Sequence, residues 1–182
     1  MIEDFQIIAA FLFFALAYIK FPDLVKVNRH FVILVGTVLT IVNFTKTAIA
    51  AFVMPKYFPD GWAKVIDVFH MIPPNHLLAA WWEDCFYVLP FLILSLSLNK
   101  MNESKRKKMA KALFYSVFAL FIAHFTMGHL YQGWVGLTVF VYPIISFKVG
   151  KKYGLGSMMM LHVLFDFTMY MSFWFAFKLM GI

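Results

Sequence analysis

Long apolar runs follow one another along the chain, separated by short polar connections. A helix needs about 20 mostly apolar residues to cross a membrane. Candidate runs of about this length lie at 2–21, 31–54, 76–98, 109–129, 134–150 and 157–180, and the fifth of them is short and contains Pro143. The pattern predicts an all-α fold, a polytopic membrane bundle of about six transmembrane helices in a single domain covering residues 1–182.

The composition agrees with a membrane protein. The chain is 63% hydrophobic and 14% charged, whereas a soluble domain is nearer half apolar and a quarter charged. The lipid bilayer is therefore the expected partner. The net charge of +7 does not indicate nucleic-acid binding here, because cations beside membrane spans are topology signals that face anionic lipid.

Basic residues concentrate in alternate connections between the apolar runs. They are Lys20, Lys26, Arg29, Lys100, Lys105, Arg106, Lys107, Lys108, Lys111, Lys148, Lys151 and Lys152. The positive-inside rule places these three connections in the cytoplasm and both termini outside, in the cell membrane. The longest connection, 55–76, predicts a short amphipathic interfacial helix between Gly61 and Met71, with Trp62 and Phe69 among its apolar positions.

Two acidic residues, Glu83 and Asp84, interrupt the third run in the stretch "AAWWEDCFYVLPF". Ionisable residues within a membrane are costly, and by default they face the bundle interior and indicate function. Adjacent residues on a helix are about 100° apart, so one carboxylate can serve chemistry while the other pairs or faces water. Lys46 in the second run is a candidate partner, although snorkelling or a structural ion pair is the simpler interpretation.

Histidines occupy two further apolar stretches, "FALFIAHFTMGHLYQGWVG" and "SMMMLHVLFDFTMY". His124 and His129 are five residues apart, about 140° around a helix, which is a poor geometry for one metal ion. His162 and Asp166 are four apart and share a helix face, where the carboxylate can orient the imidazole or the pair can simply hold helices together. Such a set suits general acid–base activation of water, or a metal site.

Taken in order, these stretches resemble the motifs of the CAAX protease and bacteriocin-processing (CPBP, type II CAAX prenyl endopeptidase-like) family. Its motifs are E-E-x-x-x-R, F-x-x-x-H and H-x-x-x-N or H-x-x-x-D, which appear here as "EDCFYV", "FTMGH" and "HVLFD". The resemblance covers a motif-bearing core at 77–170 and selects His129, four residues after Phe125, over His124. The first motif departs from the pattern, because Asp84 replaces its second glutamate and Val88 its arginine.

The resemblance implies intramembrane hydrolysis of a membrane-associated or lipidated peptide, with no covalent intermediate, no cofactor and no metal. Glu83 would be the general base and His129 would help to hold and deprotonate water. His162 would stabilise the oxyanion, and Asp166 would orient His162. Asp84, Lys46 and Phe125 are the expected supporting residues.

Two other classes of function stay open. The altered first motif favours a non-catalytic relative, a membrane scaffold or an immunity-type binding protein that keeps the fold. A histidine–carboxylate metal enzyme, such as a desaturase-like oxidase, usually needs more closely spaced histidines than the six in this chain. The single cysteine, Cys85, excludes an internal disulfide. A Cys–His dyad is conceivable, but a small packing residue is the simpler interpretation of Cys85.

Overall fold

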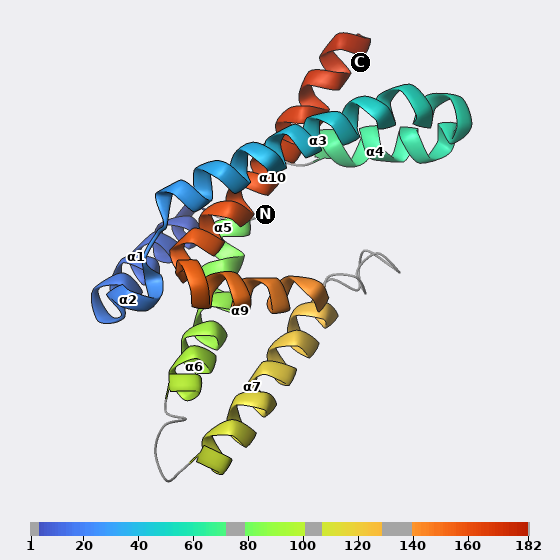
Figure 1. Ribbon diagram of the computed structural model, residues 1–182. Coiled ribbons are helices and arrows are strands. Elements are labelled where there is room, and N and C mark those ends of the chain that lie inside the picture. The colour runs from blue at the N-terminus through green and yellow to red at the C-terminus, as the bar shows by residue number, and fades with distance from the viewer. Residues whose placement is uncertain (1–3, 72–78, 101–106, 129–139, 182) are drawn as a thin grey trace.

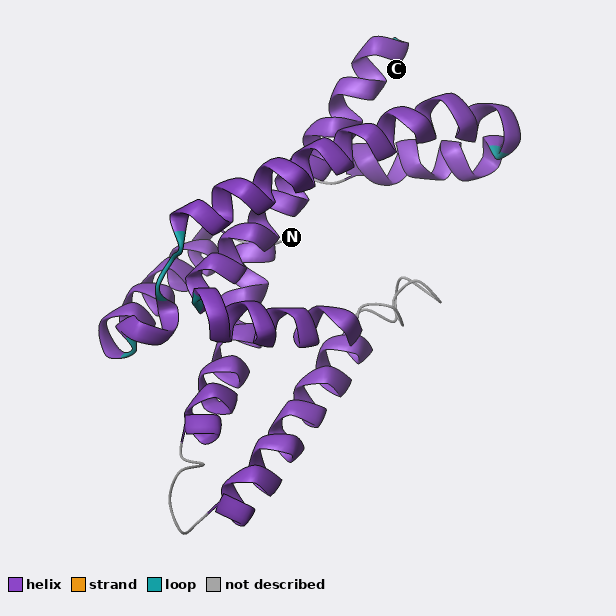
Figure 2. Cartoon of the chain, viewed as in Figure 1, coloured by secondary structure: helices purple, strands orange, loops and turns teal. Residues whose placement is uncertain are grey.

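The computed structural model describes residues 4–71, 79–100, 107–128 and 140–181 (Figure 1). These ranges form helices joined by short loops, with no strand in any of them (Figure 2). The all-α prediction is therefore confirmed for the described part of the chain. In order, the elements are α1 (Asp4–Lys20), α2 (Pro22–Val25), α3 (Arg29–Tyr57), α4 (Pro59–Met71), α5 (Ala79–Glu83), the π-helix η2 (Asp84–Val88), α6 (Leu89–Lys100), α7 (Lys107–Gly128), α9 (Val141–Tyr153) and α10 (Leu155–Met180).

Three helical segments are long and apolar enough to cross a membrane, namely Pro22–Tyr57, Trp81–Leu98 and Leu155–Met180. Two shorter apolar helices are Phe5–Lys20 and Lys111–Met127. By length and composition, the described residues thus contain three helices that could span a membrane, whereas six runs were expected from the sequence. The fifth predicted run, 134–150, corresponds to α9, which has 13 residues and begins at Val141. Residues 134–139 of that run lie outside the described residues.

The longest helix, α3, packs mainly along α10 (Figure 1). Many of its large apolar side chains are exposed, as Ile33, Leu34 and Phe52 illustrate. In water this surface would be a large apolar patch, whereas in a bilayer it faces lipid tails. The exposure pattern of α3 therefore fits a membrane helix that packs mainly against α10 and, near its end, against α4.

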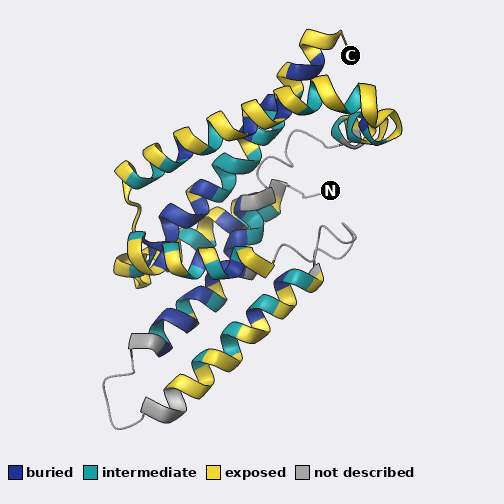
Figure 3. Cartoon of the chain, turned by 45° about the vertical axis from the view of Figure 1, so that its right-hand side comes forward, coloured by how far each residue is buried: buried dark blue, intermediate teal, exposed yellow. Residues whose placement is uncertain are grey.

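The core is formed by the first half of α10 together with α1, α2, α5, η2, α6, α7 and α9. Dark blue, buried segments gather in this region in Figure 3. Its fully buried side chains include Leu89, Leu92, Phe121 and Met159. The helix α9 crosses α6 and α7 near one end of each (Figure 1) and packs against both. The fourth apolar run thus packs on the third and fifth, and α5 and α9 of the third and fifth runs also pack on α10.

The connection between α1 and α3 packs on the turn between α9 and α10. Gly154 in that turn has φ +93° and lies against the backbone carbonyl of Lys26, so a side chain there would clash as well as strain the backbone. The backbone N–H of Asn28 donates to Ser157 Oγ at 2.6 Å, and Phe31 stacks on Tyr153 with ring centroids 3.6 Å apart. Two of the three basic connections are therefore neighbours in space.

The amphipathic helix predicted between Gly61 and Met71 is present as α4. Its Trp62 is buried and packs edge-on against Phe177 of α10, with ring centroids 5.5 Å apart. Phe69 stacks on Tyr170 of the same helix at 4.6 Å. The aromatic positions of α4 thus cover the second half of α10, while Asp60, Lys64 and Asp67 are exposed.

Candidate active site

The third apolar run is irregular at its acidic residues. After Glu83 the helix widens into the π-helical turn η2, and the N–H of Leu89 donates to the carbonyl of Asp84, five residues back. Pro90 follows directly, and a proline ring clashes with the carbonyl four residues before it in a regular α-helix. A wider turn relieves that clash. Such π-turns are rare and frequently occur at functional sites.

Asp84 is fully buried at the start of this turn and contacts two other helices. The hydroxyl of Tyr142, on α9, donates to Asp84 Oδ1 at 2.7 Å. His162 Nδ1, on α10, lies 3.1 Å from Asp84 Oδ2 and 2.8 Å from the hydroxyl oxygen of Tyr142. These three side chains, from η2, α9 and α10, are called the Asp–Tyr–His cluster below.

The end of α7 reaches this cluster through Phe125. Phe125 is buried and stacks on Tyr142, with ring centroids 4.9 Å apart and an interplanar angle of 26°. His129 comes one helical turn after Phe125 in the sequence and lies outside the described residues. His124 is exposed, and its ring centroid lies 6.1 Å from that of Phe91. Phe125, expected as a supporting residue, is therefore the link between the second motif and the site.

Glu83 and Asp166 lie at the border of the cluster. Both are partly exposed, and both are within electrostatic range of the His162 imidazole. Glu83 also acts electrostatically on Tyr142. The structure thus brings together four of the residues selected from the sequence: Glu83, Asp84, His162 and Asp166. Asp84, expected only as a supporting residue, is in direct contact with the histidine.

The remaining candidates lie elsewhere. Lys46 is exposed, with Nζ 3.1 Å from the sulfur of Met169 and 6.0 Å from the centre of the Phe165 ring, so its contacts are on α10. Val88, at the position of the family's arginine, is fully buried in the apolar core, and so is Cys85. Both have a packing role here.

Tyr142 is the site residue that the sequence analysis missed. It lies in the short fifth run next to Pro143, where a tyrosine is easily taken for an interfacial anchor. The available signal is chemical, because a tyrosine hydroxyl within an apolar segment needs a hydrogen-bond partner when it is buried. The ionisable groups of the third and sixth runs were the candidates for that partner.

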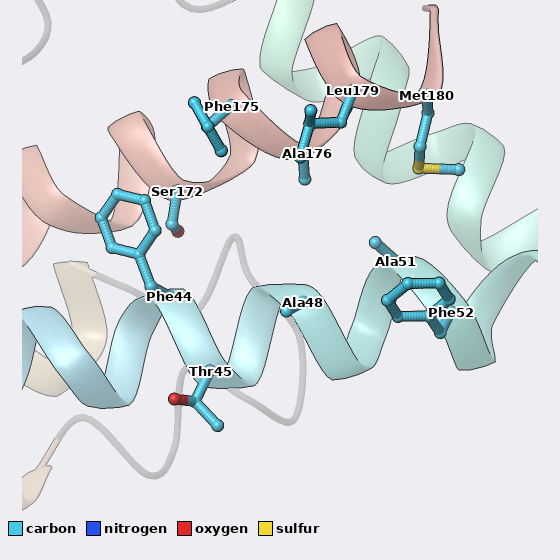
Figure 4. A pocket seen from close by; sticks show the side chains of 10 residues that line it. All are labelled: Phe44, Thr45, Ala48, Ala51, Phe52, Ser172, Phe175, Ala176, Leu179 and Met180. Atoms are coloured by element: carbon cyan, nitrogen blue, oxygen red, sulfur yellow. The ribbon is translucent and has the colours of Figure 1, made fainter.

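An apolar groove of about 480 Å³ lies between α3 and α10 (Figure 4). It is lined by Phe44, Thr45, Ala48, Ala51, Phe52, Ser172, Phe175, Ala176, Leu179 and Met180. None of these lining residues is ionisable, so the groove has no group for acid–base chemistry. Among the residues that the structure describes, no group of three or more His, Cys, Asp or Glu side chains is arranged to hold a metal ion.

Comparison of the chain with models of protein families, with curated proteins and with solved structures finds no match. The resemblance to the CPBP family therefore rests on the three motifs themselves. What the structure adds is that parts of all three motif stretches lie together, at the Asp–Tyr–His cluster and the Phe125 ring that packs on it.

Proposed function

We propose that this chain is an intramembrane endopeptidase that hydrolyses a peptide bond of a membrane-associated or lipidated peptide. One observation supports this function above the others. Three short motifs that are far apart in the sequence meet in space, because Asp84 of the first contacts His162 of the third, and Phe125 of the second packs on the Tyr142 ring that bonds to both. A scaffold has no need to gather scarce ionisable groups in an apolar interior.

In the proposed reaction, Glu83 accepts a proton from a water molecule as the water oxygen attacks the carbonyl carbon of the substrate. The C–N bond then breaks, and the proton passes to the amine that leaves. His129 helps to hold the water, and His162 faces the developing oxyanion. Glu83 suits the role of base because it is partly exposed, whereas Asp84 beside it is fully enclosed.

In the proposed topology the chain crosses the cell membrane six times, with both termini outside and the basic connections in the cytoplasm. The contact between the α1–α3 connection and the α9–α10 turn supports a common face for two of these connections. The short helix α9 packs against α6, α7 and α10, and it carries Tyr142 of the cluster. The hydrolytic site would therefore lie inside the bilayer, within the 77–170 core.

The test is cleavage by the purified protein in liposomes. The probes are a farnesylated peptide with a CAAX-type C-terminus, the same peptide without the lipid, and a set of apolar membrane peptides, and mass spectrometry detects the products. We expect Glu83→Gln, His129→Ala and His162→Ala to lower the rate by about 10²–10⁴-fold while the helical circular dichroism is kept. Asp67→Asn, on the exposed side of α4, is the matched control. Full activity in Glu83→Gln or His129→Ala would overturn this mechanism.

The non-catalytic alternative has one observation in its favour. Val88 is buried among apolar side chains where the family pattern has an arginine, so the guanidinium that would contact the carboxylates is missing. Wild-type protein that binds these peptides without cleaving any of them would favour a binding protein. Metal analysis of the purified protein tests the metal-enzyme alternative.

A further inference from the structure

The hydroxyl of Tyr142 lies between a carboxylate and an imidazole, and it has one proton to donate. Its oxygen is 2.7 Å from Asp84 Oδ1, 2.8 Å from His162 Nδ1 and 3.2 Å from the sulfur of Met158. An ionised carboxylate can only accept hydrogen bonds. Charge-assisted O–H···O bonds are also the short, strong ones. The Tyr142 hydroxyl therefore donates its one hydrogen bond to Asp84.

This assignment determines the proton on the histidine. Once the Tyr142 hydroxyl donates to Asp84, its lone pairs are what it offers to His162 Nδ1, so Nδ1 must carry a proton to make the 2.8 Å contact. The other oxygen, Asp84 Oδ2, is 3.1 Å from the same nitrogen, an ion-pair distance, and it accepts no well-aligned hydrogen bond from the described residues. The carboxylate thus reaches the imidazole chiefly through the tyrosine, as N–H···O–H···O.

Packing holds the tyrosine in this position. Phe125 stacks on one side of its ring, and the centre of the His162 ring lies 4.6 Å from the centre of the Tyr142 ring. Side chains from α7 and α10 therefore hold the ring of Tyr142, which projects from α9. A side chain held in this way can orient its neighbour at little entropic cost.

We propose that Tyr142 is a positioning residue that, together with Asp84, keeps a proton on Nδ1 of His162. Nε2 is then the ring atom that meets water or substrate, and it donates to the oxyanion when the imidazole is doubly protonated. This inference rests on the proposed function, in which His162 acts at the reacting carbonyl. It differs from the role that the motif pattern gives to Asp166, because the hydrogen-bonded ring nitrogen faces across to η2 and α9. In the opposite arrangement Asp84 would be protonated and would donate to the Tyr142 oxygen. The Tyr142 hydroxyl would then donate to His162 Nδ1, which would carry no proton.

The tautomer can be measured directly. Protein labelled with ¹⁵N-histidine is reconstituted in lipid bilayers and studied by solid-state NMR, and the His162 resonances are identified by their disappearance in His162→Gln. We expect a protonated Nδ1 in the wild type. A bare Nδ1 with a proton on Nε2 would overturn the proposal. The measurement needs no substrate, so it is independent of whether the protein cleaves any peptide.

Two variants test whether Asp84 and Tyr142 keep the proton on Nδ1 of His162. In Asp84→Asn the amide can donate toward Nδ1, so we expect the proton to move to Nε2; an aspartate-to-asparagine change beside a catalytic histidine produces the wrong tautomer in the same way. Tyr142→Phe keeps the stacking on Phe125 but removes the hydroxyl. We expect it to give a mixture of tautomers and to lower the cleavage rate by about tenfold or more.

The matched control is Tyr153→Phe. Tyr153 lies on the same helix, α9, and stacks on Phe31, so its ring contact survives the change. We expect wild-type tautomer and rate in this variant. A Tyr142→Phe protein with an unchanged His162 spectrum would overturn the positioning role. The expected tautomer shifts together with no peptide cleavage by the wild type would instead count against the proposed function alone.

Discussion

Two buried polar regions lie along the same helix, α10, and they are built from different chemistry. Near its start is the Asp–Tyr–His cluster. Further along, α3 and α10 share a polar seam formed by Asn43, Thr47, Thr168 and Ser172. Asn43 Nδ2 donates to Thr168 Oγ1 at 2.9 Å and to the carbonyl of Phe165 at 3.1 Å. The hydroxyls of Thr47 and Ser172 are 2.8 Å apart.

The two regions differ in the kind of group that they bury, because the seam contains neutral side chains and the cluster contains ionisable ones. Neutral amides and hydroxyls between membrane helices hold the helices together, and every member of the polar seam has a partner. The seam includes two of the three buried residues of α3, which are Gly36, Asn43 and Thr47. The cluster instead buries a carboxylate beside an imidazole, which is costly in a membrane. Its Asp84 Oδ2 lies 3.1 Å from the His162 imidazole, so the cluster depends on a pair of ionisable groups, whereas the seam depends on neutral ones.

The largest expected effect comes from removing the carboxylate of the cluster. Asp84→Ala leaves the Tyr142 hydroxyl without its acceptor and His162 without the carboxylate beside it, and breaking one side of a buried charged pair costs about 3–5 kcal/mol in the free energy of unfolding. Reversible unfolding in detergent micelles measures this loss. Asp84→Asn, which keeps the shape, should cost less, and Asp67→Ala on exposed α4 should stay within about 0.5 kcal/mol. An Asp84→Ala protein as stable as that control would remove the distinction between the regions.

A smaller loss is expected at the centre of the polar seam. Asn43→Ala removes two hydrogen bonds to α10, and such interhelical bonds contribute about 1–2 kcal/mol in model peptides. A double-mutant cycle with Thr168→Val isolates the coupling between the two side chains. Thr45→Ala, at an exposed position of α3, is the control. Strictly additive losses would show that this contact does not hold α3 to α10.

The smallest effect is expected at the end of the polar seam. Thr47→Val removes one hydroxyl–hydroxyl bond and keeps the side-chain shape, so we expect a loss of about 0.6 kcal/mol, the average for such bonds in a membrane protein. Peptide cleavage should be close to wild type, in contrast with Glu83→Gln. Unfolding and cleavage assays on the same sample check both points. A cleavage defect as severe as that of Glu83→Gln would mean that the seam takes part in the site.

The positions of the helices were largely predictable, and their ends were not. The apolar runs at 31–54 and 157–180 correspond to α3 (Arg29–Tyr57) and α10 (Leu155–Met180), because backbone groups in lipid must pair within their own segment. The fifth helix was expected to end at Gly150 but continues to Tyr153. Gly150 stays helical beside the Leu155 side chain, and Gly154 takes the positive φ that ends the helix.

Most residues of the candidate site were predictable from the sequence, but the contacts between them were not. Glu83, Asp84, His162 and Asp166 were selected because ionisable groups in apolar runs are rare. Which carboxylate meets His162 depends on the π-turn at Asp84 and on how α9 crosses the neighbouring helices. Tyr142 carried no comparable signal, since a tyrosine is common near the ends of membrane spans.

By itself, the sequence determined that this chain is helical, that it is apolar enough for a membrane, and which few side chains are expensive to bury. Those properties follow from local composition and from the need to satisfy each segment's own backbone. Only the tertiary structure decided that Asp84 and His162 meet through Tyr142, because that contact joins η2, α9 and α10. The rotation of each helix about its axis depends on packing against the others, and no single segment encodes it.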